Sequence, residues 1–189
     1  MCKYWDEAFW YLIGAMGDGT TYITSDGHYV IEYGQRDRRW LEVLKSKVEH
    51  LGFKAYIVHH KGKYWKLKIY SKEFHNTVSQ IRINMQSELS TLPIELFKAY
   101  VRGLFDAEGT ITKHTSKTAR IRIAQKNKAL LEIIAKRLRE LGIHVTNPFP
   151  SDKRGTYVIQ IPHTYIRKFI EIVGTEHPSK KSKYEFMLH

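Results

Sequence analysis

Two segments of the chain are apolar on almost every side, which is unusual for helices at a protein surface. Residues 6–17 (DEAFWYLIGAMG) begin with Asp6, a suitable N-cap, and residues 93–107 begin with Pro93, which suits the first helical position. A helix that is hydrophobic all round must be buried. We therefore expect two buried helices that cover one another.

The same series of elements follows each apolar helix. Two stretches of β propensity predict a hairpin, and the next helix has apolar residues at every third or fourth position. A second hairpin and a shorter helix complete the series. These elements are expected at residues 20–24, 28–33, 38–51, 65–69 and 74–83, and again at residues 110–113, 119–124, 128–141, 157–161 and 165–173. The predicted order is αββαββα, twice.

A repeat with an offset of 90 residues, from position 18 to position 108, relates the two series. The offset pairs Gly17–Thr20 with Ala107–Thr110, Gln35 with Gln125, and Leu51-Gly52 with Leu141-Gly142. Such a repeat indicates two copies of one structural unit. The predicted fold class is α+β, with pseudo-twofold-related αββαββα half-domains at residues 1–88 and 93–189. The linker is predicted at residues 89–92, within the polar segment 84–92.

Composition and charge narrow the class of protein. The chain has 189 residues, 42% of them hydrophobic, which is enough for a core, and one cysteine, Cys2, which excludes a disulfide framework. The net charge is +12 and the pI is near 9.7, so a polyanion such as nucleic acid is the expected partner. Without a signal-like or membrane-length apolar stretch, we expect a cytoplasmic protein and no membrane partner.

Two acidic residues stand at corresponding places after the apolar helices. Asp18 and Glu108 each lie between small residues, and each is followed by Gly-Thr. Small residues in both helices would let the helix ends approach closely, and the two carboxylates would then repel unless a cation lay between them. Oxygen ligands of this kind suit Mg²⁺, which can act on phosphodiesters. A lone Gly-Asp-Gly is most often a turn, but the duplicated context favours a nuclease site.

These motifs resemble those of a known family. Val101–Gly109 (VRGLFDAEG) matches the nine-residue LAGLIDADG motif in register, and Tyr11–Gly19 (YLIGAMGDG) matches it less closely. In the first motif Gly14 lies one position later than the usual glycine, and Met16 replaces the first acid. The chain therefore resembles a single-chain, two-motif LAGLIDADG homing endonuclease of the kind encoded in introns or inteins.

The resemblance implies a metal-dependent endonuclease that cuts both strands of a DNA site across the minor groove and leaves 3′ overhangs. It implies Asp18 and Glu108 as catalytic metal ligands for Mg²⁺ or Mn²⁺. The backbone neighbours Gly17 and Ala107 complete the expected metal set. Gln35 and Gln125 would lie near the metals. An equally good interpretation is that both are simply exposed glutamines at the ends of strands. The water-positioning basic residue would be Lys113 or a lysine within residues 177–183.

The resemblance also implies that the two sheets form a saddle over the DNA major groove, with outward strand side chains as the DNA contacts. The candidates are Tyr22, Thr24, His28, Tyr29, Glu32, Tyr33, Lys66, Lys68 and Tyr70 in the first half, and Thr112, His114, Arg120, Arg122, Arg154 and Gln160 in the second. Arginine can read guanine through two hydrogen bonds, while other contacts to phosphate carry no sequence information.

Two kinds of partner and activity remain open. The main prediction is a monomer that cleaves double-stranded DNA. The alternative is a protein that binds nucleic acid without cutting it, either an intron RNA maturase or a DNA-binding regulator. The presence of both acids favours the enzyme, because binding alone gains little from two carboxylates that repel one another.

Overall fold

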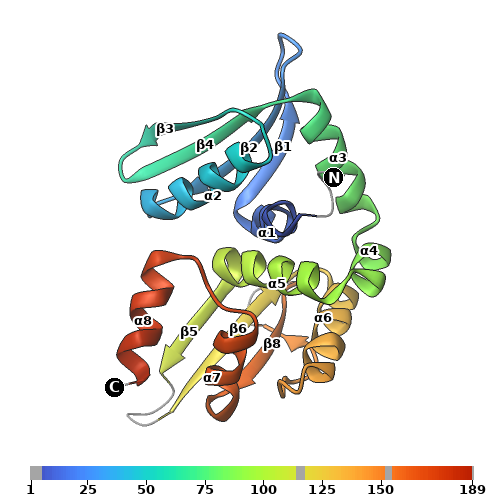
Figure 1. The fold of residues 1–189 in the computed structure, drawn as a ribbon, viewed down its shortest axis with the longest axis vertical. Coiled ribbons are helices and arrows are strands. Elements are labelled where there is room, and N and C mark those ends of the chain that lie inside the picture. The colour runs from blue at the N-terminus through green and yellow to red at the C-terminus, as the bar shows by residue number, and fades with distance from the viewer. Residues whose placement is uncertain (1–5, 114–117, 152–154, 189) are drawn as a thin grey trace.

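The computed structural model describes residues 6–113, 118–151 and 155–188 (Figure 1). The first half contains α1 (Glu7–Gly14), the 3₁₀ helix η2 (Ala15–Asp18), β1 (Gly19–Ile23), β2 (Tyr29–Gln35), α2 (Arg38–His50), β3 (Ala55–Lys61), β4 (Tyr64–Tyr70) and α3 (Lys72–Ile83). The second contains α5 (Ile94–Glu108), β5 (Gly109–Lys113), β6 (Ala119–Gln125), α6 (Lys128–Glu140), β7 (Phe149–Pro150), β8 (Tyr157–Pro162) and α7 (His163–Ile172). Helices α4 (Met85–Thr91) and α8 (Pro178–Leu188) follow the two halves.

The two halves share one topology. The first sheet has strand order β1-β2-β4-β3 and the second has β5-β6-β8-β7, with antiparallel pairing throughout. The predicted α+β fold with two αββαββα half-domains is therefore confirmed. The last hairpin is less regular in the second half, where β7 contains only two residues.

Side-chain caps fix where several helices begin. Asp6 accepts a hydrogen bond from the amide of Ala8 at the start of α1. Asp37 and Asn127, which the 90-residue offset relates, cap α2 and α6 in the same way. Such caps satisfy amide groups that have no partner within the helix. The repeat is thus visible in the boundaries of the helices as well as in the strands.

Helices α1 and α5 lie side by side between the two sheets and carry much of the core (Figure 1). Glycine makes the close approach possible. A Cβ atom on Gly14 would overlap the carbonyl oxygen of Tyr100 and lie 2.8 Å from the amide nitrogen of Leu104. The shifted glycine of the first motif therefore still packs directly against the backbone of α5.

The polar segment expected to be a linker is a helix instead. Residues Met85–Thr91 form α4, so the predicted boundary at residue 88 falls inside a helix. Leu89 is fully buried, and the guanidinium of Arg137 in α6 donates hydrogen bonds of 2.7 and 2.6 Å to the carbonyls of Leu89 and Leu92. Tertiary anchoring by α6 thus orders a segment with few apolar residues of its own.

The residues before α8 and its first turn contact α2 of the first half, although they follow the second, while the helix itself lies beside β5. Ser179 donates a hydrogen bond of 2.6 Å to the Asp37 carboxylate, and the ring of His177 stacks on Trp40 at 5.3 Å. In the described part of the chain, no helix is both long and apolar enough to span a membrane.

Candidate functional site

The two acidic residues lie at the ends of the paired central helices. Asp18 is the last residue of η2 and Glu108 the last of α5, and the glycine after each begins a strand. A Cβ atom on Gly17 would lie 2.7 Å from Oε1 of Glu108, so the Glu108 side chain lies directly against the first motif. The fold brings the two predicted metal ligands into one site.

The charges in this site are strongly coupled. Burial and, to a smaller extent, the negative charge of Glu108 raise the pKa of Asp18 to about 6, although the charge of Lys180 and a hydrogen bond from Gln35 oppose the increase. Two partly buried carboxylates that repel one another form a favourable place for a cation.

Gln35 and Gln125 both lie near the motif helices, with different neighbours. The side-chain amide of Gln35 donates a hydrogen bond of 3.0 Å to Oδ2 of Asp18, and its oxygen accepts one of 2.7 Å from the amide of Arg36. Gln125 lines a pocket of about 160 Å³ together with Gly17 and Arg82. Gln35 is therefore held on a predicted metal ligand, and Gln125 lies near Gly17 of the first motif.

A lysine from α8 lies at the site. The ammonium of Lys180 donates hydrogen bonds to the carbonyl oxygens of Phe105 and, at 2.7 Å, Asp106. Burial lowers the pKa of Lys180 to about 8, and the charges of Asp106, Asp18 and Glu108 oppose this decrease. Lys180 belongs to the window of residues 177–183 that the sequence indicated, but the sequence did not distinguish it from its neighbours.

Lys113, the other candidate, ends β5 at the far end from Glu108. It lies four positions from the start of the strand, a distance of about 13 Å along the strand at the usual rise per residue. Its side chain lies outside the described part of the structure. The backbone geometry favours Lys180 as the basic residue of the site.

The residues fit a hard divalent cation. The described residues contain no group of three or more His, Cys, Asp or Glu side chains suited to a metal, so the site offers Asp18 and Glu108 with nearby backbone carbonyls. Mg²⁺ commonly uses one or two carboxylates and completes its shell with water and phosphate oxygens. The bare backbone at Gly17 leaves room that any side chain would fill. Gly17 and Ala107 immediately precede the acids, in keeping with the predicted metal set.

The outer face of the first sheet carries a network of polar side chains. Strand pairing places Thr20, Tyr22, Glu32, Lys66 and Lys68 on one face, opposite the core. Glu32 accepts a hydrogen bond of 3.1 Å from Tyr22 and lies 2.7 Å from the ammonium of Lys66 and 3.7 Å from that of Lys68. This face can present both hydrogen-bond donors and acceptors to a ligand.

Two of the predicted contacts in this half point the other way. Tyr33 is fully buried and donates a hydrogen bond of 3.0 Å to the carbonyl of Leu12. Tyr29 packs edge to face against His75 of α3, at 5.2 Å between rings. Both residues have the strand parity of Ile31, which faces the core, so their prediction as outward residues was wrong. Thr24 and His28 close the turn between β1 and β2, where the Thr24 hydroxyl accepts a hydrogen bond of 2.9 Å from the His28 amide.

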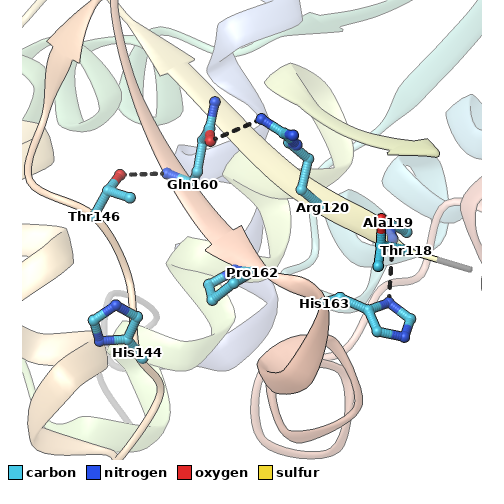
Figure 2. Close-up of a pocket in the computed structure, with 8 residues that line it drawn as sticks. All are labelled: Thr118, Ala119, Arg120, His144, Thr146, Gln160, Pro162 and His163. Carbon is cyan, nitrogen blue, oxygen red and sulfur yellow. Dashed lines mark hydrogen bonds between the residues drawn. The ribbon is translucent and has the colours of Figure 1, made fainter. Parts of the chain in front are cut away.

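The outer face of the second sheet is more basic. Thr112, Arg120, Arg122 and Gln160 share this face by strand pairing, and Arg120 donates a hydrogen bond of 3.4 Å to Gln160. These two side chains line a pocket of about 330 Å³ (Figure 2). Strand pairing places it toward the end of the sheet remote from Gly109, which follows Glu108. The pocket is lined by Thr118, Ala119, Arg120, His144, Thr146, Gln160, Pro162 and His163. The predicted contacts His114 and Arg154 lie outside the described residues.

Several residues of these faces were missed. Tyr56 and Val58 share the outer face of the first sheet and are 52% and 39% exposed, and His144 and Thr146 line the pocket in the second half. The residues of β3, AYIVHHK, are apolar or aromatic from Ala55 to Val58, so no alternation marked the first pair. His144 and Thr146 precede the short strand β7 and alternate with the buried residues Ile143 and Val145, a pattern that could have identified them.

Comparisons with known proteins agree with this site. An LAGLIDADG-like domain matches residues 95–174, and the WhiA LAGLIDADG-like domain matches residues 10–96. The chain is 29% identical to homing endonuclease I-ApeI of Aeropyrum pernix over 195 residues, covering 96% of this chain and 87% of the relative. It is 28% identical to homing endonuclease I-DmoI of Desulfurococcus mucosus over 183 residues, covering 88% and 87%.

Solved structures show the same likeness. The structure of I-DmoI in complex with DNA and Mn superposes with a TM-score of 0.69 at 27% identity, covering 89% of this chain and 96% of that one. The matched family domains together span both motif helices and both sheets. The chain belongs to the LAGLIDADG homing endonuclease family.

Proposed function

We propose that this protein is a site-specific DNA endonuclease that uses a divalent metal to hydrolyse both strands of a duplex target. The observation that carries the proposal is the meeting of Asp18 and Glu108 at the ends of two glycine-packed helices. Two relatives along most of the chain are named homing endonucleases, and I-DmoI is known in complex with DNA. Cleavage across the minor groove with 3′ overhangs is part of the proposal.

Asp18 and Glu108 would hold the metal, for which we propose Mg²⁺ or Mn²⁺. When bound, the metal supplies Lewis-acid stabilisation of charge on the phosphodiester. Structures of I-DmoI or its variants have been described with Mn, Mg and Ca, which supports dependence on divalent metal. In this chain Gln35 holds the Asp18 carboxylate in place by a hydrogen bond, and Lys180 provides positive charge beside both acids.

The partner is double-stranded DNA, bound on the outer faces of the two sheets. Arg120 and Arg122 of the second sheet have no acidic counterpart like Glu32 among the candidates on that face, so we expect the second half to bind phosphate more strongly. Both acids belong to one chain, so a single chain can form the complete site. We therefore propose that the enzyme acts as a monomer.

The test is cleavage of a plasmid that carries the intronless insertion site of the host element. We expect linear product with Mg²⁺ and none with EDTA, and sequencing of the ends should give 3′ overhangs. Asp18→Asn and Glu108→Gln should abolish cutting. Glu132→Gln is the matched control, because it removes an exposed carboxylate that pairs with Lys128 on α6. Unchanged cutting by either site variant would contradict the proposed site.

The competing function is binding without cleavage, by an RNA maturase or a DNA-binding regulator. A wild-type protein that binds the insertion site but does not cut it with Mg²⁺ or Mn²⁺ would support the regulator. Assisted splicing of the intron RNA that persists in Asp18→Asn would support the maturase. Repelling carboxylates at a helix junction favour the endonuclease, because neither alternative requires them.

A further inference from the structure

A second acidic residue of the second motif is buried beside the site. The side chain of Asp106 is almost inaccessible, with 1% of the residue exposed. Its carboxylate accepts hydrogen bonds from the hydroxyl of Tyr11 at 2.6 Å and from the hydroxyl of Thr175. It also accepts hydrogen bonds from the amides of Glu176 at 2.8 Å and His177 at 3.2 Å. Asp106 therefore joins the first half to the segment that leads into α8.

The same segment places Lys180. The carbonyl of His177 accepts the amide hydrogen bonds of Lys180 and Lys181, each at 3.0 Å, which form the first turn of α8. The ammonium of Lys180 then returns to α5 and donates to the carbonyls of Phe105 and Asp106. The carboxylate of Asp106 thus holds the residues that begin the first turn of α8. The carbonyl oxygen of Asp106 accepts a hydrogen bond from Lys180, which lies in that turn.

The two halves of the chain differ at both ends of this connection. The 90-residue offset aligns Asp106 with Met16, which has no carboxylate. Helix α4 corresponds to α8 by its place after the half-domain, and its residues, MQSELST, include neither lysine nor arginine. The buried acid and the site lysine thus occur together in the second half, and their counterparts in the first half are both missing.

We propose that Asp106 is a positioning residue, which holds Lys180 beside Asp18 and Glu108 by anchoring the amides before α8. The inference rests on the proposed endonuclease function. A carboxylate that accepts successive amide groups fixes a helix start in the manner of an N-cap. Because a lysine side chain is a flexible stem of four carbons, its ammonium stays in place only when the backbone that carries it is fixed.

Other contacts keep α8 attached when the Asp106 carboxylate is changed. The His177 ring stacks on Trp40, Ser179 donates to Asp37, and Glu176 lies 2.8 Å from the ammonium of Lys47. Asp106→Asn keeps the size of the side chain but provides one acceptor oxygen in place of two. The expected result is a displaced Lys180 on a protein that remains folded.

The experiment compares Asp106→Asn, Lys180→Met and the double variant in single-turnover cleavage, with target binding measured in Ca²⁺. If Asp106 acts through Lys180, each single variant should slow cleavage by about tenfold or more while binding changes little, and the double variant should be no slower than Lys180→Met. Leu138→Ala, a buried substitution in α6, is the control for a general loss of stability. Wild-type cleavage by Asp106→Asn, multiplied effects in the double variant, or equal slowing by Leu138→Ala would overturn the proposal.

A second measurement does not depend on cleavage. Mass spectrometry can follow modification of Lys180 by an amine-reactive reagent, with the exposed Lys128 as internal reference. The reactivity of Lys180 relative to Lys128 should change several-fold in Asp106→Asn, because the amine leaves the buried position that shields it and lowers its pKa. Unchanged reactivity would contradict the positioning role even if the wild-type protein cut no DNA, whereas a lack of cleavage alone would count against the proposed function.

Discussion

The backbone of Tyr11 lies directly against Gly103. A Cβ atom on Gly103 would be 2.9 Å from the carbonyl carbon of Tyr11 and 3.0 Å from the amide nitrogen of Ala15. The contact reciprocates that of Gly14 with α5, so each central helix presents a bare backbone to the other. The close approach is what brings Asp18 and Glu108 into one site.

Gly103→Ala should therefore destabilise the protein, by about 3 kcal/mol, because backbone atoms cannot move aside as a flexible side chain can. Urea denaturation gives the measurement. Gly34→Ala is the matched control, since its nearest neighbour would be a side-chain carbon of Tyr64 at 3.8 Å. Equal stability of the two variants would show that the helices can separate without cost.

Asp18→Asn should abolish cleavage and yet stabilise the metal-free protein. The pKa of Asp18 is raised to about 6 by burial and by Glu108, so the charge that it carries at pH 7 costs the folded state free energy relative to the unfolded state. After allowance for partial exposure, removing that charge should add about 1 kcal/mol to the free energy of unfolding in EDTA. Added Mg²⁺ should raise the melting temperature of the wild-type protein more than that of the variant. A less stable variant in EDTA would contradict the coupling of the carboxylates.

The contribution of His177 to the stability of the fold should decrease between pH 7 and pH 5, while protonation of Asp18 acts in the opposite direction. Burial and, to a smaller extent, the charge of Lys180 lower the pKa of His177 from 6.5 to about 4. The unfolded chain thus binds a proton in this range before the folded protein does, and stability is lost as the pH falls from 6.5 toward 4. We expect a loss of about 1 kcal/mol at pH 5 after discounting for partial exposure. His177→Phe should remove most of this slope in denaturation curves, and exposed His60→Gln should keep it.

Neighbouring residues of β2 should have separate roles. Tyr33→Phe removes the hydrogen bond to Leu12 and should cost about 1 kcal/mol of stability without changing the preferred target. Glu32→Gln alters the outer face and should change the tolerance for single-base substitutions in the target, by about 1–3 kcal/mol per contacted base pair. Urea denaturation measures the stability, and cleavage of a set of single-base target variants measures the target preference of both proteins. A changed preference in Tyr33→Phe alone would mean that the faces are assigned the wrong way.

The 90-residue repeat predicted most of the fold because matching residues in the two halves occupy matching places in corresponding helices and strands. Gln35 and Gln125 end corresponding strands, and the caps Asp37 and Asn127 begin corresponding helices. The direction of Tyr33 could not be read in the same way. Residues 28–33 (HYVIEY) are apolar or aromatic at both parities, so only packing beneath α1 shows which parity is buried.

Two further features depend on contacts between distant residues. Helix α4 has one buried apolar residue, Leu89, and its order depends on Arg137, which lies 48 positions away. Lys180 stands among other lysines with no periodic pattern, and only the fold brings it to the carbonyls of α5. Local patterns predict elements, but they do not identify which of several similar side chains reaches a site.

The crossing of α4 onto α6 and of α8 onto α2 limits how this enzyme can be recombined. A hybrid of the first half of this chain with the second half of a relative would place foreign residues at positions 176–179 against Asp37, Trp40 and Lys47. Such a hybrid would lack matched partners at the very segment that carries the site lysine. A hybrid should therefore take the strands of one half-domain from the relative and keep α2 and α8 from the same parent protein.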